Sequence, residues 1–247
     1  MCDLAQMFPA AHIAPTAIIG NQFRPLLDGR EVRVDRATQI GADVWIGHYT
    51  TVGQGVTIGD NSILEEYVGV EPRAEIGMRA LVASRSWIGI GAKLGDESVT
   101  KGYIGDHARV GARCRIFGDL IHRQLDPSVP WDAAAAEEPA PWVKDGAFVG
   151  WRALVVGGVN IGEGAYVCAG ALITRDVPPW HIAYGRNQIR HPDDWPGTLG
   201  KSSFFPDRRQ IRQATPIGSR PRRLIGTRPW VSVEPSGSRR RAGSSRR

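Results

Sequence analysis

The stretch from residue 40 to residue 99 decides the fold, because it divides into ten consecutive hexads: IGADVW, IGHYTT, VGQGVT, IGDNSI, LEEYVG, VEPRAE, IGMRAL, VASRSW, IGIGAK and LGDESV. Every hexad begins with Ile, Leu or Val, and seven of the ten have glycine in second place. The fifth place is always small or β-branched. Since Ile, Leu and Val fill 52 of 247 positions, chance would give this aliphatic row with a probability of roughly 10⁻⁷.

A period of six does not match the 3.6-residue period of an amphipathic helix, nor a long alternating strand. It is typical of short strands separated by turns, with three hexads closing one triangular coil of about 18 residues. The first and fifth residues of each hexad then point inward, and glycine supplies the tight corners. The sequence predicts an all-β fold, a parallel β-helix solenoid, whose stacked inner row includes Ile40, Ile58, Ile76 and Leu94.

The repeat covers only part of the chain and is interrupted. It begins near residue 13, pauses at 25–33, has extra residues at 100–103, and is broken by an insertion at 122–142. It ends at Val177, before two prolines, after about seven coils. We expect an N-terminal lead-in (1–12), the β-helix with its protruding loop (13–177), an irregular and partly helical extension (178–218), and a basic, disordered tail (219–247).

Composition and charge exclude several classes of protein. No apolar run approaches the roughly 18 residues that a membrane helix needs, and three cysteines form no disulfide framework. Residues 1–200 have a balance of −5, whereas residues 201–247 have +11, so the basic pI belongs to the C-terminal tail. We therefore expect a soluble, reduced, cytoplasmic protein that does not span a membrane, and binding to nucleic acid is not indicated.

The hexads resemble those of the left-handed parallel β-helix proteins of the hexapeptide-repeat acyltransferase family. A narrower segment, residues 115–185, looks like the sugar acetyltransferases of that family: a histidine precedes a protruding loop, and the coils end in AGALITRDVP, residues 169–178. The resemblance implies left-handed coils and acetyl transfer from acetyl-CoA to an amino or hydroxyl group of a sugar or nucleotide-sugar. It also implies a homotrimer with active sites between chains, and no metal.

His122 is the candidate general base, because it opens the long insertion and a neutral imidazole accepts protons near neutral pH. A carboxylate on its other ring nitrogen would fix the tautomer, and Asp119 and Asp126 are the two nearest in sequence. His48 and His107 fall on outward hexad positions and are expected to be ordinary surface residues. The alternative reading is that His122 only hydrogen-bonds the loop backbone.

Two further groups of residues follow from the resemblance and from the loop composition. The acyl-CoA would lie along the later coils, with backbone amides of the Gly157-Gly158 corner contacting the oxyanion. The proposed acyl-CoA contacts are Gly157, Gly158, Ala169, Gly170, Thr174, Arg175 and Arg186. The loop would bind the acceptor through aromatic and charged side chains: Arg123, Asp126, Trp131 and Asp132. The string YGRNQIR (184–190) departs from the family's usual ending, where the family contacts the adenine end of the donor.

Two other functions fit the same repeat. One is a non-catalytic β-helix scaffold or assembly protein. The other is a γ-type carbonic anhydrase, which needs three zinc-binding histidines, two of them closely spaced. His107 and His122 lie 15 residues apart and no closely spaced pair occurs, which disfavours the zinc enzyme. The sequence does not distinguish nitrogen from oxygen acceptors, nor acetyl from longer acyl groups.

Overall fold

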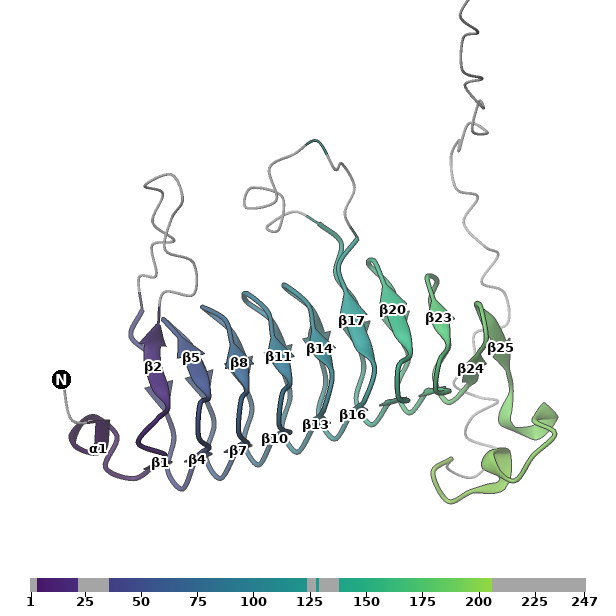
Figure 1. Ribbon diagram of the computed structural model, residues 1–247. Helices are drawn as coiled ribbons and strands as arrows, with labels where there is room; N and C mark the ends of the chain where they lie inside the picture. The colour runs from purple at the N-terminus through teal and green to yellow at the C-terminus, as the bar shows by residue number, and fades with distance from the viewer. Residues whose placement is uncertain (1–3, 22–35, 124–127, 129–137, 206–247) are drawn as a thin grey trace, which may run out of the picture. The chain divides into compact units, whose positions relative to one another are not determined.

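The computed structural model describes residues 4–21, 36–123, 128 and 138–205. Within them the chain winds into parallel coils, each of which adds one strand to each of three sheets (Figure 1). The chain divides into two units, residues 1–215 and 216–247, and the second unit lies outside the described residues. The expected basic tail (219–247) therefore lies outside them too.

Sheet A contains ten strands, parallel except for the last: β1 (His12–Ile13), β4 (Trp45–Ile46), β7 (Ile63–Leu64), β10 (Leu81–Val82), β13 (Val99–Thr100), β16 (Arg115–Ile116), β19 (Phe148–Val149), β22 (Tyr166–Val167), β24 (Ile182–Tyr184) and β25 (Gln188–Arg190). Sheet B contains eight: β2 (Ile18–Asn21), β5 (Thr51–Gly53), β8 (Gly69–Val70), β11 (Trp87–Ile88), β14 (Tyr103–Ile104), β17 (Asp119–Ile121), β20 (Leu154–Val156) and β23 (Leu172–Ile173). Sheet C contains seven: β3 (Gln39–Ile40), β6 (Thr57–Ile58), β9 (Glu75–Ile76), β12 (Lys93–Leu94), β15 (Arg109–Val110), β18 (Trp142–Val143) and β21 (Asn160–Ile161).

The first residue of each hexad points inward, as predicted. In sheet C, Ile40 pairs with Ile58, Ile58 with Ile76, and Ile76 with Leu94, so that the row runs straight through the coils. Ile58, Ile76 and Leu94 are each only 2% exposed. Burying one such side chain contributes about 1.5–3 kcal/mol, and the row repeats in all three sheets. The predicted fold class, a left-handed parallel β-helix of about seven triangular coils, is confirmed.

Glycine has a different role in the hexad from the predicted one. The left-handed backbone needed at each corner falls on the fourth residue, where φ is 54° at Asp43, 59° at Tyr49 and 57° at His107. Second-position glycines are required by crowding instead. A Cβ on Gly59 would lie 2.6 Å from the backbone nitrogen of Met78 in the next coil. The stacking of coils, rather than the turn, therefore selects glycine in second place.

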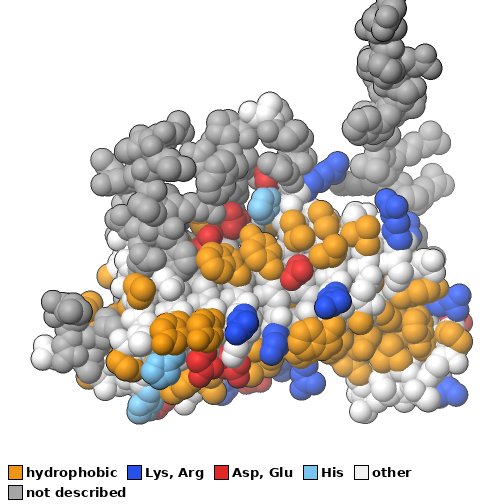
Figure 2. Space-filling view, in the orientation of Figure 1, with side chains coloured by type: hydrophobic (Ala, Val, Ile, Leu, Met, Phe, Trp, Pro, Cys, Tyr) orange, Lys and Arg blue, Asp and Glu red, His pale blue; other side chains and the backbone are white. Residues whose placement is uncertain are grey.

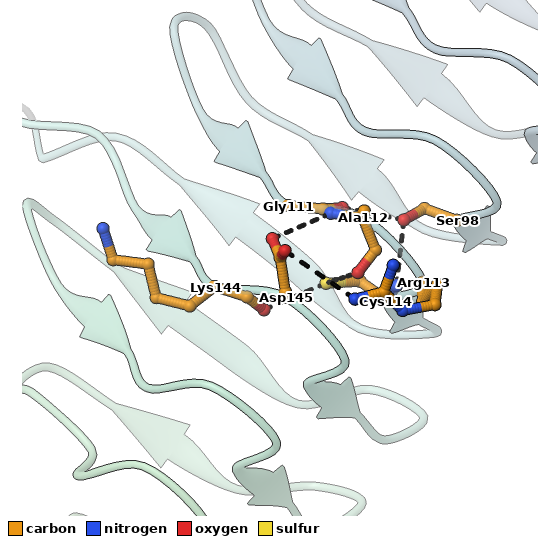
Figure 3. A network of polar contacts seen from close by, with 7 residues as sticks. All are labelled: Ser98, Gly111, Ala112, Arg113, Cys114, Lys144 and Asp145. Carbon is orange, nitrogen blue, oxygen red and sulfur yellow. Dashed lines mark hydrogen bonds and ion pairs between the residues drawn. The ribbon is translucent and has the colours of Figure 1, made fainter. Parts of the chain in front are cut away.

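Polar residues in the fifth position are satisfied by the neighbouring coil. Ser98 Oγ donates to the carbonyl of Gly111 at 2.8 Å and accepts from the backbone N–H of Cys114 at 2.9 Å (Figure 3). The Cys114 thiol, which is buried, donates to the carbonyl of Lys144 at 3.1 Å (Figure 3). Burial raises the pKa of the Cys114 thiol to about 11. Hydrogen bonds between coils thus satisfy the inward-facing hydroxyl of Ser98, which is buried without being left unpaired.

The expected extra residues at 100–103 are not an insertion. Thr100 lies in β13, fully buried, and pairs with Val82 and Ile116. It occupies an inner aliphatic position, so residues 100–103 form a hexad shortened by two residues. Residues 116–119 repeat this shortening, and Leu120 fills the next inner position. The prediction failed because a β-branched Thr replaced the expected aliphatic residue.

Past Val177 the parallel sheet continues for one more strand. β24 pairs with β22 in parallel, and β25 then turns back antiparallel to β24. Two short 3₁₀ helices follow, η1 (Pro192–Asp194) and η2 (Leu199–Lys201), and one helical turn, α1 (Leu4–Met7), precedes β1. No helix among the described residues is long and apolar enough to cross a membrane.

Candidate active site

Both long insertions leave the β-helix at the corner between sheets B and C. The first lies between β2 and β3, and the second between β17 and β18 (Figure 1). His122 directly follows β17, and Glu138 stands on the returning limb of the second insertion. A backbone hydrogen bond from Arg123 N–H to the Pro139 carbonyl, 2.9 Å long, closes the base of this insertion.

The imidazole of His122 is paired with the carboxylate of Glu138. Nε2 of His122 lies 3.1 Å from Oε2 of Glu138, and the two side chains are 25% and 6% exposed. Nδ1 of His122 is buried and forms no hydrogen bond with the part of the chain that the structure describes. A proton on Nε2 satisfies the carboxylate and leaves the lone pair on Nδ1, which is the state that a general base requires.

Asp119, one of the two expected partners of His122, has a different role. Its Oδ1 accepts a hydrogen bond from the backbone N–H of Tyr103 at 2.9 Å. The same bond between adjacent coils recurs elsewhere, for example from Ala42 N–H to Asp60 and from Met78 N–H to Asp96. Asp119 therefore belongs to a repeating structural contact of the solenoid. Asp126, the other expected partner, lies outside the described residues.

His107 is not the ordinary surface residue that its hexad position predicts. It lies one coil before His122 at the same corner, is half-buried, and lines a hollow of about 260 Å³ together with Glu138, Ala140 and Pro141. Burial lowers the pKa of His107, and the positive charge of Arg73 lowers it further against the opposing effect of Asp106. The fourth position faces outward in a bare coil, but here it shares a hollow with residues of the returning insertion.

The Gly157-Gly158 corner lies next to His122, one coil later. The N–H of Gly157 already donates to the carbonyl of Ile121 at 2.8 Å, so this amide is not open to a ligand. The N–H of Gly158 donates to no acceptor among the described residues. Both glycines also make room for the loop: a Cβ would lie 3.3 Å from Arg123 Cβ at Gly157 and 2.8 Å from Pro139 Cβ at Gly158.

The remaining residues expected to contact acyl-CoA fall at two places. Thr174 and Arg175 share the corner of His122 and are tied to Asn187 in the β24–β25 turn, beside Arg186. The Thr174 N–H donates to Asn187 Oδ1 at 2.8 Å. Ala169 and Gly170 are exposed, but they lie between β22 and β23, at the corner between sheets A and B. The structure brings Thr174, Arg175 and Arg186 together and places Ala169 and Gly170 at a different corner.

Of the expected acceptor-binding residues, only Arg123 is described, and it is exposed at the base of the insertion. Asp126, Trp131 and Asp132 lie outside the described residues. Sequence reasoning missed Glu138 and His107. Among residues 4–21, 36–123, 128 and 138–205, no group of three or more His, Cys, Asp or Glu side chains could hold a metal ion.

Two family models match the coils. Residues 37–72 match the bacterial transferase hexapeptide (six repeats), and residues 144–175 match the hexapeptide repeat of succinyl-transferase. The two matches fall on either side of the insertion and agree with the three-sheet coil. Both segments of the chain therefore carry hexapeptide repeats of the kind that these two models describe.

Similar proteins of known sequence cover only part of the chain. It is 43% identical over 54 residues to the bifunctional protein GlmU of Thermotoga petrophila, across 22% of this chain and 12% of that protein. It is 32% identical over 95 residues to the bifunctional protein GlmU of Francisella tularensis, across 38% of this chain and 19% of that protein. The chain thus spans less than a fifth of the length of these relatives.

Solved structures are similar over more of the chain, at low identity. The acetyltransferase domain of PglB from Neisseria gonorrhoeae, in complex with acetyl coenzyme A, has 14% identity and a TM-score of 0.31, and the match covers 74% of this chain and 55% of that one. UDP-N-acetylglucosamine acyltransferase from Campylobacter jejuni has 17% identity and a TM-score of 0.35, covering 81% of each chain.

Proposed function

We propose that this protein is an acyl-CoA-dependent acyltransferase that transfers an acetyl group from acetyl-CoA to an amino or hydroxyl group of a sugar or nucleotide-sugar. The observation that carries the proposal is the His122–Glu138 pair, with 3.1 Å between Nε2 and Oε2, at the base of an insertion in a hexapeptide β-helix. Active groups concentrate on loops that a rigid scaffold holds in place.

In the proposed reaction the acceptor reaches the buried Nδ1 of His122, which takes the proton from its hydroxyl or amine as that oxygen or nitrogen attacks the thioester carbonyl. The carbon–sulfur bond then breaks, and the departing thiolate of coenzyme A takes the proton back from the imidazole. Glu138 holds the Nε2 proton and stabilises the imidazolium that forms between these steps. The N–H of Gly158, one coil away, donates to no acceptor among the described residues and would stabilise the oxyanion.

Donor and subunit contacts complete the proposal. Thr174, Arg175 and Arg186 would bind the nucleotide end of the acyl-CoA, because exposed guanidinium groups pair with phosphate. Ala169 and Gly170 lie at another corner of the same coil, so one acyl-CoA would meet them on a neighbouring chain in a homotrimer. Sheet B exposes apolar side chains on its outer face, which supports such packing (Figure 2): Ile18, Trp87, Tyr103 and Leu154.

The test is release of free thiol from acetyl-CoA in the presence of amino sugars and nucleotide-sugars. We expect turnover with at least one acceptor, and a loss of roughly 10²-fold in kcat for His122→Ala, the usual size for a general base. His48→Ala is the matched control, because His48 lies at another corner, bonded to Thr16 Oγ1 at 2.9 Å. A folded protein that cleaves no thioester with any acceptor would favour the scaffold alternative.

A further inference from the structure

The hollow beside the His122–Glu138 pair has a lining suited to an anion. It measures about 260 Å³ and opens between the outer face of sheet C and the returning insertion. Its lining residues are His107, Arg109, Glu138, Ala140, Pro141, Trp142 and Asn160. Glu138 belongs both to this hollow and to the pair with His122, so a molecule in the hollow lies next to the proposed base.

Arg109 supplies a positive charge to this lining. The outer face of sheet C has a charged column in which Glu75 is bonded to Lys93, at 2.8 Å, and to Arg36, at 3.5 Å. Arg109 is the next residue after Lys93 in this column, and it forms no ion pair among the described residues. Its five N–H donors are therefore available, in a geometry that matches a carboxylate or a phosphate.

Trp142 packs against the guanidinium of Arg109. It is the neighbour of Arg109 in the sheet, and the Arg109 guanidinium lies 5.7 Å from the centre of its ring. Lys144 also contacts this ring, and burial and then repulsion from Arg109 lower the pKa of Lys144. Two cations thus contact one indole ring, and an anionic ligand would offset the repulsion between them.

We propose that the hollow binds an anionic group of the acceptor, a carboxylate or a phosphate, through Arg109. The half-buried imidazole of His107 adds a further hydrogen-bonding group on the wall. Glu138 also lines the hollow and is engaged with His122, so the acceptor's attacking group would lie near that pair. This inference rests on the proposed function and narrows it: the acceptor is an acidic sugar or a sugar phosphate, rather than a neutral sugar.

The experiment measures binding by isothermal titration calorimetry, without turnover. The probes are N-acetylglucosamine 1-phosphate, glucuronate, neutral N-acetylglucosamine and coenzyme A. The variants are Arg109→Gln and, as the matched control, Arg115→Gln, since Arg115 is an exposed arginine on the outer face of sheet A. We expect an anionic sugar to bind at least about tenfold more tightly than the neutral one, the size of one charge-assisted hydrogen bond. Arg109→Gln should abolish that preference, and Arg115→Gln should keep it.

The outcomes separate the inference from the function on which it rests. Equal binding of neutral and anionic sugars, or a preference that persists in Arg109→Gln, would overturn it. So would a variant that loses affinity only for coenzyme A, because the hollow would then bind the donor. If the parent binds the sugar phosphate through Arg109 but releases no thiol from acetyl-CoA, the anion site stands and acyl transfer fails. If thiol is released but no anionic probe binds, acyl transfer stands and the anion site fails.

Discussion

Nε2 of His122 and Oε2 of Glu138 lie 3.1 Å apart, although the two residues stand at opposite ends of the insertion. The pair therefore exists only when the insertion closes on itself, which the backbone bond between Arg123 and Pro139 secures. The carboxylate is nearly buried and the imidazole partly so, which makes their interaction stronger than that of an exposed pair.

Glu138→Gln should lower kcat about tenfold or more while leaving the KM for acetyl-CoA unchanged. The neutral amide keeps a similar shape but no longer stabilises the imidazolium that forms during the reaction. The rise of activity with pH should therefore move to lower pH, a readout that loss of packing alone would not change. Glu97→Gln is the control, since Glu97 is an exposed partner of Arg79 in another coil. An unchanged pH profile in Glu138→Gln would show that Glu138 takes no part in the reaction.

His107 should titrate below the ordinary histidine range. Burial lowers its pKa, and the charges of Arg73, His122 and Arg109 lower it further, against the opposing effect of Asp106. The unfolded chain then binds this proton at a higher pH than the folded chain does, so the free energy of unfolding falls as the pH drops below about 6.5. Following the imidazole Cε1–H resonance by NMR checks this.

The dependence of the free energy of unfolding on pH provides a second check on His107. Acidification from pH 7 to 5 should destabilise the parent more than His107→Gln, which has no group to protonate at this position. His48→Gln serves as control, because His48 is exposed. A resonance midpoint above 6.5, or equal acid sensitivity of the parent and His107→Gln, would contradict the burial of His107.

The coils could be predicted from the sequence because the hexad repeats the same inward position many times. Ile58 and Ile76 share one row for this reason alone. Thr100 could not be placed, since a single β-branched residue does not mark the inner position of a shortened hexad. Past Val177, two prolines indicated an end, yet β24 finds its partner in β22, a long-range pairing that no local pattern encodes.

The site could be predicted only where one local signal marked it. His122 stood out as the first residue of the long insertion. Glu138 did not, because closure of the insertion brings it near, whereas sequence distance favoured Asp119. A local clue against Asp119 existed: acids in third place, such as Asp60 and Asp96, recur and bond the adjacent coil. His107 was hidden because its burial depends on residues 138–141, some thirty positions later.

Cys114 should be inert to thiol reagents in the folded protein. With a pKa raised to about 11 by burial, only ~10⁻³ of the thiol is ionised at pH 8. Labelling with a chromogenic disulfide in buffer should therefore give the same count of reactive thiols for the parent and for Cys114→Ser. In 8 M urea, by contrast, the parent should give one more. Fast labelling of Cys114 in native buffer would show that the inner fifth position is open to solvent.

Ile58→Asp should prevent folding, and Ile63→Asp should not. Ile58 is 2% exposed in the inner row between Ile40 and Ile76, whereas Ile63, on the outer face of sheet A, is 42% exposed. An unpaired carboxylate at the inner position costs several kcal/mol, comparable to the whole stability of many domains, while the outer one stays hydrated. Circular dichroism and urea denaturation of both variants measure the difference. Because each coil rests on the next, Ile58→Asp should abolish the cooperative urea transition of the entire β-helix, whereas Ile63→Asp should keep it. Similar midpoints for the two variants would mean that Ile58 does not face the interior.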